Sequence, residues 1–191
     1  MIIDLHTVRT SNQSVLNAAD LGTEVYMSPN PTSTKTGPEQ LQELYTNLQA
    51  NFNVKAIWIQ VTSPVKWEPT VAKNIQFISS IIQAAKAYGL AVGIYTSAYD
   101  WQQITNDWLG PTDTLLWYWS VLGPGPMAET SNNFEDYHPF GPWKTPAVKQ
   151  FGQQEPICGQ TVNRDVFTPT VLAARSAFTA SDGKIQIGGY V

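Results

Sequence analysis

The sequence has few charged residues and no concentration of positive charge. Only 14% of its 191 residues are charged, with 15 acids against 11 bases, and no segment clusters Lys and Arg. Proteins that bind nucleic acid or anionic membranes usually carry a basic patch, so we expect neither as a partner. The surface must instead rely on Asn, Gln, Ser and Thr, a composition compatible with sugar binding.

Cysteine and histidine are almost absent. Cys158 is the only cysteine, so no disulfide can form within this chain, and the histidines are His6 and His138 alone. Without a second Cys or a His pair, we expect no metal and no cofactor. Glycine-rich phosphate loops and a Gly-x-Ser-x-Gly nucleophile elbow are also missing, although a Ser-His-Asp arrangement stays open as an alternative.

No apolar run approaches the length of a membrane span. The start, Met-Ile-Ile-Asp-Leu-His, lacks a basic region, and Asp4 interrupts its apolar residues. We therefore predict no secretory signal in this chain.

Strand-like and helix-like segments alternate along the chain. Apolar positions recur at helical spacing over 38–48, behind Pro38, and over 71–85, ending at Gly89 as a C-cap candidate. The predicted strands are 23–28, 54–62, 90–97, 115–119, 147–151 and 161–167, with 2–8 as a further candidate and 12–20 as a short helix. Since these strands are mostly apolar, the pattern predicts an α/β fold with a parallel sheet covered by helices.

Six or seven strands are too few for a closed eight-stranded βα barrel. We therefore expect an incomplete, TIM-type βα barrel over residues 1–168. An open barrel leaves an unpaired strand edge, through which we expect oligomerisation or poor solubility. Residues 169–191 are expected to form a C-terminal tail, with a helical stub and a loosely held end.

The alternation of side chains along a strand predicts which residues face a site. Ile57, Ile59 and Val61 share one face of their strand, and Trp58, Gln60 and Thr62 share the other. Ligands of parallel α/β folds bind at the C-terminal ends of the strands. The candidate substrate-binding residues are Gln60, Thr62, Tyr95, Ser97, Asp100, Trp117, Gln150 and Asn163.

Structural alternatives exist for each of these residues. The polar groups could satisfy one another inside the barrel, and aromatic residues such as Trp117 are more often core than sugar-stacking platforms. Asp100 follows the strand 90–97 directly, and we favour a role as the N-cap of the next helix over ligand binding. His138 is expected at the surface.

Several stretches together resemble a known family. They are Ile-Trp-Ile-Gln-Val-Thr-Ser-Pro (57–64), Val-Gly-Ile-Tyr-Thr-Ser-Ala-Tyr-Asp-Trp (92–101), Leu-Leu-Trp-Tyr-Trp (115–119), Phe-Gly-Pro-Trp (140–143), Val-Lys-Gln-Phe (148–151) and Val-Asn-Arg-Asp-Val-Phe (162–167). In order and spacing the sequence resembles the protist- and invertebrate-type lysozymes of glycoside hydrolase family 25. The resemblance implies a modified βα barrel that cleaves β-1,4 bonds of bacterial peptidoglycan, in a secreted or vesicular protein of innate immune defence or digestion.

The chain differs from that family at the positions where the resemblance implies acidic residues on the strands. The resemblance implies an Asp on the first strand, an Asp-x-Glu pair on the middle strand and an Asp on the last. Here the middle pair falls on Gln60 and Thr62, and the last Asp falls on Asn163, with Asp165 two residues later. The family's first strand has no counterpart, so we expect an N-terminally shortened relative that has lost its signal peptide, and with it a partner of Cys158.

The missing acids leave two hypotheses. Glycoside hydrolysis ordinarily requires two carboxyl groups, although in substrate-assisted enzymes the acetamido group of the sugar replaces one of them. Asp165 is then our first candidate for the catalytic acid, and Glu24 the second. The alternative is a catalytically silent, glycan-binding or signalling relative, in which Asp165 pairs with Arg164 or a neighbouring strand.

Overall fold

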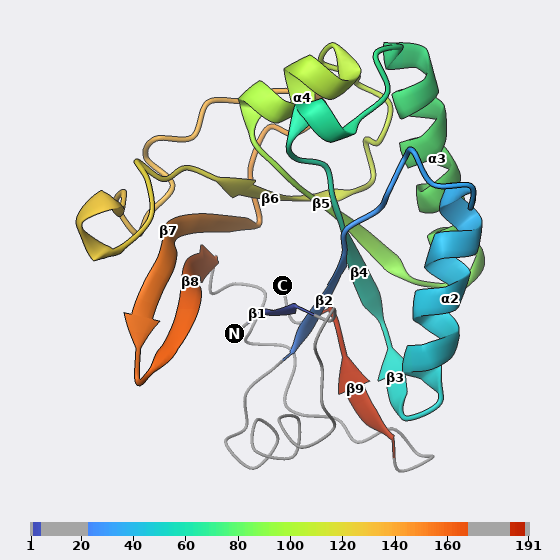
Figure 1. The fold of residues 1–191 in the computed structure, drawn as a ribbon, viewed down its shortest axis with the longest axis horizontal. Helices are drawn as coiled ribbons and strands as arrows, with labels where there is room; N and C mark the ends of the chain where they lie inside the picture. Colours follow the sequence, from blue (N-terminus) through green and yellow to red (C-terminus); the bar gives the residue numbers. More distant parts are fainter. Residues whose placement is uncertain (1, 5–22, 168–183, 190–191) are drawn as a thin grey trace.

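The described residues form a curled seven-stranded sheet with helices on its outer face, and a second sheet of two short strands (Figure 1). The computed structural model describes residues 2–4, 23–167 and 184–189. The strands of the main sheet follow the order β1-β2-β4-β5-β6-β7-β8. They are β1 (Ile2–Asp4), β2 (Glu24–Met27), β4 (Ala56–Gln60), β5 (Ala91–Thr96), β6 (Leu115–Trp119), β7 (Val148–Ile157) and β8 (Gln160–Phe167). All neighbours from β1 to β7 are parallel.

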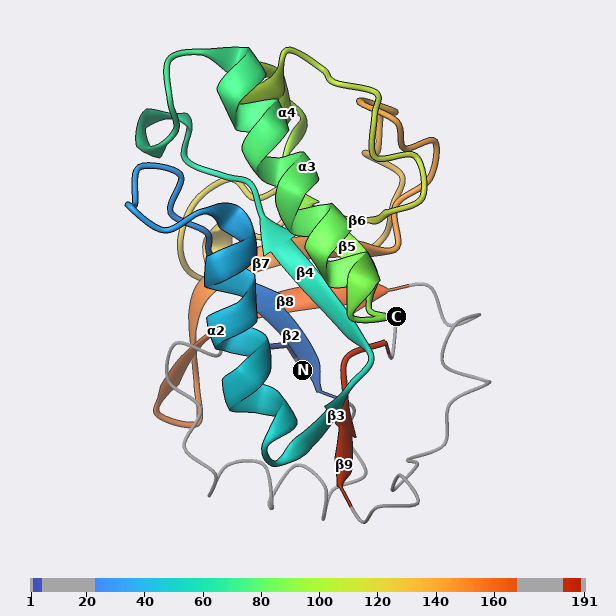
Figure 2. The same ribbon diagram turned by 90° about the vertical axis from the view of Figure 1, so that its right-hand side faces the viewer.

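Within the described residues, three helices connect the strands and cover the convex side of the sheet. They are α2 (Gly37–Gln49), α3 (Val71–Ala87) and α4 (Ala98–Thr105), with the short 3-10 helices η2 (Pro64–Lys66) and η3 (Pro126–Ala128) in loops. Turning the molecule by 90° shows α2 and α3 lying side by side along β4 (Figure 2). No helix within the described residues is long and apolar enough to cross a bilayer.

The two helical patterns in the sequence are confirmed. Helix α2 begins with a capping box, in which the Thr36 hydroxyl accepts from the backbone of Glu39 and the Glu39 carboxylate accepts from the backbone of Thr36. Pro38 lies in its first turn. Helix α3 ends at Ala87, and Gly89 follows at a φ of +74°, a conformation that glycine adopts without strain.

Each face of the sheet has its own hydrophobic cluster. Val25, Ile57, Ile59 and Ile94 point outward and pack under the helices, all at most 1% exposed. The inner, concave face carries a second cluster of Trp58, Trp117 and Val148, with partly buried residues around it. The division predicted from strand alternation is therefore confirmed.

Two strand predictions need correction. The expected strand 54–62 divides into β3 (Phe52–Val54) and β4, because β3 leaves the main sheet and pairs with β9 (Ile185–Ile187). The expectation of parallel strands throughout is wrong for β8, which runs antiparallel to β7. The two form a hairpin whose tip, at Cys158 and Gly159, has positive φ at both residues, so the strand returns without a crossover helix.

Near each end of the chain the described residues form a short strand whose bounds the sequence pattern did not predict. Of the candidate strand 2–8, residues Ile2–Asp4 form β1 beside β2. Within the expected tail, β9 pairs with β3, and Ile187 is fully buried in the outer core. The predicted helix 12–20 and the predicted helical stub lie outside the described residues.

Candidate functional site

Aromatic side chains form the floor of the concave face. The rings of Trp58 and Trp117 meet edge to face at 5.8 Å, and Tyr26 and Tyr95 contact Trp117 at 6.3 and 4.4 Å. Trp58 and Trp117 are only 2% and 4% exposed. Both side chains are therefore part of the core, which for Trp117 is the alternative to stacking on a sugar. They position the polar groups above them.

Gly93 on β5 makes room for this floor. It pairs in register with Trp58, whose indole lies where a side chain at position 93 would begin. A glycine inside a strand often marks such a close approach, so Gly93 is a sequence signal for the inner face.

Asp165 lies on β8 against the aromatic floor. Its Oδ1 accepts a hydrogen bond of 2.9 Å from the indole nitrogen of Trp117. Burial raises the pKa of Asp165 to about 7, and the bond from Trp117 only partly offsets this effect. Arg164 turns the other way, to Glu129 and the ring of Phe151, so the alternative pairing of Asp165 with Arg164 does not occur.

A short hydrogen-bonded chain lies beside Asp165. The Tyr95 hydroxyl donates to Gln150 Oε1 at 2.8 Å, and the Asn163 amide donates to the same oxygen at 3.5 Å. Gln150 is buried and pairs in register with Asp165, whereas Asn163 is exposed and accepts from the backbone of Gln154. The amides of Gln150 and Asn163 therefore lie beside the carboxyl group of Asp165 on the β7–β8 hairpin.

Glu24 occupies a different place, at the start of β2. It is 3% exposed, and its Oε2 accepts from the indole of Trp58 at 2.9 Å and from the backbone of Gly189 at 3.2 Å. These bonds tie the inner face to the residues after β9. Gln60 and Thr62 lie at and beyond the C-terminal end of β4, and Ser97 lies beyond that of β5, so Glu24, the first residue of β2, is separated from them along the strands.

The prediction that Asp100 is the N-cap of α4 is wrong. Ser97 is the N-cap, and its hydroxyl accepts from the backbone of Asp100 at 3.1 Å. The buried Asp100 carboxylate accepts from the Trp119 indole at 3.1 Å and from the backbone of Ser63. Burial raises the pKa of Asp100, while these hydrogen bonds act in the opposite direction. Asp100 thus fastens the loop after β4 to α4 and β6.

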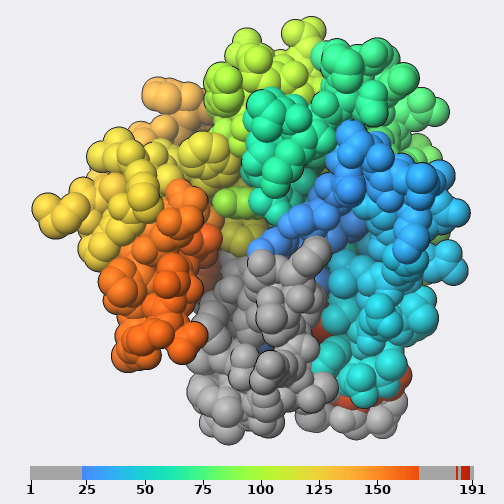
Figure 3. All heavy atoms as spheres, in the orientation of Figure 1, coloured from blue at the N-terminus to red at the C-terminus, as the bar shows by residue number. Residues whose placement is uncertain are grey.

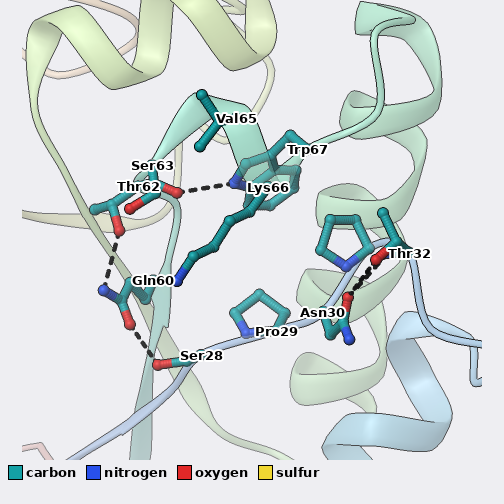
Figure 4. Close-up of a pocket in the computed structure, with 11 residues that line it drawn as sticks. Ser28, Pro29, Asn30, Thr32, Gln60, Thr62, Ser63, Val65, Lys66 and Trp67 are labelled. Carbon is teal, nitrogen blue, oxygen red and sulfur yellow. Dashed lines mark hydrogen bonds between the residues drawn. The ribbon is translucent and has the colours of Figure 1, made fainter.

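The loops after β2 and β4 enclose a pocket of about 540 Å³ (Figure 4). The side chain of Gln60 lies at its edge, where Ser28 donates to its oxygen and its amide donates to Thr62 at 3.0 Å. The lining residues are Ser28, Pro29, Asn30, Pro31, Thr32, Gln60, Thr62, Ser63, Val65, Lys66 and Trp67. Polar and apolar side chains both line the pocket, and no acid lines it among the described residues.

The predicted residues therefore fall into connected groups. Gln60 and Thr62 belong to the pocket, and Gln60 pairs in register with Tyr95, which leads to the group around Asp165. Ser97 and Asp100 do not line the pocket, but the Asp100 carboxylate accepts a hydrogen bond from the backbone of the lining residue Ser63. The space-filling view shows that β2, the loop after β4 and the β7–β8 hairpin border one hollowed face (Figure 3).

Sequence reasoning missed Lys66 and Trp67 in the pocket and Lys149 outside it. The Trp67 indole donates to the Thr62 carbonyl oxygen at 3.0 Å, and the Ser63–Pro64 pair that begins η2 was a visible turn signal. Lys149 is fully buried on the outer face. No sequence signal distinguishes it from an exposed lysine. Among the described residues, no group of three or more His, Cys, Asp or Glu side chains could hold a metal ion.

Comparison with known sequences places the chain among lysozyme-like proteins. Residues 3–151 match the family model described as lysozyme-like protein 1. Lysozyme-like protein 1 of Caenorhabditis elegans is 47% identical over 95% of this chain and 66% of its own length. Lysozyme-like protein 7 of the same organism is 51% identical over 91% and 61%. The chain thus spans somewhat less than two thirds of these relatives.

The likeness extends to lysozymes of glycoside hydrolase family 25. A probable family 25 lysozyme of Dictyostelium discoideum is 34% identical over 76% of this chain and 66% of its own length. Among solved structures, a muramidase from Trichobolus zukalii has a TM-score of 0.64 at 15% identity, and a family 25 lysozyme from Aspergillus fumigatus has 0.61 at 15%. Each covers 83% of this chain, and 73% of the solved chain is matched. This likeness confirms the expected fold, a modified βα barrel that is curled, incomplete and mostly parallel.

Proposed function

Because this chain belongs to the lysozyme-like protein 1 family and is similar to lysozymes of glycoside hydrolase family 25, we propose that it binds bacterial peptidoglycan and hydrolyses its β-1,4 bonds with Asp165 as the acid. The observation that carries this proposal is the environment of Asp165. With a pKa raised to about 7, its carboxyl group is available in the protonated form near neutral pH. An exposed Asp would be ionised there and could not donate.

A second enzymic carboxyl is not required in substrate-assisted hydrolysis. The acetamido oxygen of the sugar attacks the anomeric carbon, and Asp165 donates its proton to the departing glycosidic oxygen as that bond breaks. Water then attacks the same carbon and re-forms the acetamide, and the Asp165 carboxylate takes up the proton that the water releases. The amides of Gln150 and Asn163 are the groups beside Asp165 that would orient the acetamide. Glu24 stays the second candidate acid, although its burial beneath Trp58 favours a structural role.

A catalytically silent, glycan-binding protein is the second candidate function. Gln60 and Thr62 stand where the family resemblance implies an acid pair, and they are hydrogen-bonded to each other. Neither side chain transfers protons at neutral pH. A pocket lined by hydroxyl and amide groups suits the hydroxyl groups of a glycan whether or not a bond is cleaved.

Release of reducing sugar from purified peptidoglycan distinguishes the two functions. We expect the wild type to release sugar, and Asp165→Asn to be slower by about 10²- to 10⁴-fold, the usual contribution of a general acid. Asp113→Asn, a change at an exposed carboxylate, is the matched control and should retain activity. Equal inactivity of the wild type and Asp165→Asn, with glycan binding retained, would leave binding as the function.

The setting that we propose is innate immune defence or digestion, in a secreted or vesicular location, as is usual for lysozymes. A fluorescent fusion followed in cells, together with bacterial survival in its presence, tests this setting. Uniform fluorescence throughout the cytosol would contradict it.

A further inference from the structure

The pocket between the loops after β2 and β4 contains one positive charge and no negative charge among the described residues. Ten of its lining residues are neutral, and the remaining one is Lys66, on η2. Its side chain extends into the pocket toward Gln60 (Figure 4). Lys66 makes no ion pair with any side chain in the part of the chain that the structure describes, whereas Lys35, Lys73, Lys86, Lys149 and Arg164 each do.

The backbone that presents Lys66 is held from several sides. The Lys66 amide donates to the Ser63 carbonyl oxygen at 2.9 Å, and the Trp67 amide donates to Pro64 at 3.1 Å. Below them, the buried Trp67 indole is bonded to Thr62, and the Asp100 carboxylate is bonded to the backbone of Ser63. The ammonium group therefore extends from a fixed loop, which reduces the entropy lost when it binds a ligand.

The neighbours of Lys66 suit a polar ligand that carries a negative charge. Hydroxyl and amide groups of Ser28, Asn30 and Gln60 line the opposite wall, and they can bond to sugar hydroxyl groups. An ammonium group among neutral neighbours favours a negatively charged group by direct attraction, and none of the described residues that line the pocket is a competing carboxylate.

We propose that Lys66 makes this pocket selective for amino-sugar chains that carry a carboxylate. This inference rests on the proposed glycan-binding function and names the substrate class within it. In peptidoglycan, carboxylates are present on the attached peptides and on the lactyl ether of those alternate sugars that carry no peptide, whereas chitin, of the same backbone linkage, has none. Lys66 is thus a specificity residue, and its loss reduces discrimination rather than binding in general.

Isothermal titration with three soluble probes of equal length tests the proposal. The probes are muramyl glycan strands with free carboxylates, the same strands with those carboxylates methyl-esterified, and chitin oligosaccharides. We expect the wild type to prefer the free-carboxylate strands, and Lys66→Met to bind them about 3- to 10-fold more weakly, the range of a partly exposed ion pair. Affinity for the two neutral probes should change less than about twofold, and Lys66→Arg should retain the preference.

Lys55→Met is the matched control, because it removes the same charge from an exposed site just before β4, at the opposite end from Gln60. It should leave all three affinities unchanged. The proposal is overturned if Lys66→Met weakens all probes equally or none of them, or if Lys55→Met has the same effect. If the wild type binds none of the probes, the proposed function itself fails. Circular dichroism of each variant checks that the exposed substitutions leave the fold intact.

Discussion

The indole nitrogen of Trp117 donates a hydrogen bond to Asp165 across the concave face, joining β6 to β8 over the intervening β7. The two residues are 48 positions apart in the sequence. The bond is possible because the sheet curls, which brings side chains of next-but-one strands within reach of a long indole. It places the carboxyl group of Asp165 against an apolar floor, which is the cause of its raised pKa.

The pH dependence of stability should report this environment. Since the pKa of Asp165 in the folded state is about 7, above the ordinary value of 3.8, the folded protein keeps a proton that the unfolded chain releases. The free energy of unfolding should therefore fall as pH rises from about 4 to about 7 and then level off. Because Asp165 is partly exposed, we expect a contribution on the order of 1–2 kcal/mol.

Urea unfolding of the wild type and Asp165→Asn at pH 5, 6 and 8 isolates this contribution. Other groups titrate in both proteins, so the difference between them belongs to position 165. The variant should gain stability relative to the wild type as pH rises. Identical pH profiles would show that the carboxyl group is not held in a low-dielectric environment.

Substitution of Gly93 should disturb the aromatic floor. In Gly93→Ala the added methyl group would overlap the buried Trp58 indole, which must move and lose its bond to Glu24. We expect a loss of about 1–3 kcal/mol in the free energy of unfolding and a change in tryptophan fluorescence.

Gly89→Ala is the comparison, because open space surrounds that position and only its φ of +74° opposes a side chain. It should cost about 1 kcal/mol and leave the fluorescence unchanged. An unaltered spectrum in Gly93→Ala would mean that Trp58 is not confined as described.

Removal of the Asp100 carboxylate should loosen the pocket. In Asp100→Ala the Trp119 indole and the backbone of Ser63 lose their acceptor, so we expect a loss of about 2–4 kcal/mol in unfolding free energy. Proteolysis within the loop 61–70 should also become faster, which limited digestion followed by mass spectrometry measures. Asp113→Ala, at an exposed ion pair, should change stability by less than about 0.5 kcal/mol. Comparable losses in the two variants would argue against the anchoring role.

Lys149 should be the costliest lysine to replace. Its ammonium group is fully buried and donates to Asp136 at 2.8 Å and to the carbonyl oxygens of Ser131 and Asn133 at 2.7 and 3.1 Å. Lys149→Met leaves these acceptors without their donor, and we expect a loss of about 2–3 kcal/mol, moderated because Asp136 is partly exposed.

The exposed Lys144 offers the control, and Lys144→Met should change the unfolding free energy by less than about 0.5 kcal/mol. Chemical denaturation of both variants in the same buffer makes the comparison. Similar stabilities would show that the buried ammonium group contributes no net stabilisation.

The spacing of apolar residues along the sequence predicted those helices and strands in which one spacing is dominant. The strand Ala56–Gln60 begins with a continuous apolar run, and the helix Val71–Ala87 follows from apolar residues at spacings of three to four. The alternation that assigned Gln60 and Tyr95 to the inner face also holds, because a strand that is covered on one side has only one usable orientation. The same logic did not detect β9, since three residues are too few to form a pattern without their partner β3.

The sequence by itself determined the α/β class, the two longer helices α2 and α3 and the set of polar residues that turn inward, because side-chain periodicity is a local property of the backbone. Only the tertiary structure decided that β8 runs antiparallel, that Asp165 lies beside Trp117, and that Lys66 extends into a pocket whose described lining contains no acid. These relationships join residues on different strands and loops. The curl of the sheet and the turns between its strands set their distances, and neither is encoded at any single position.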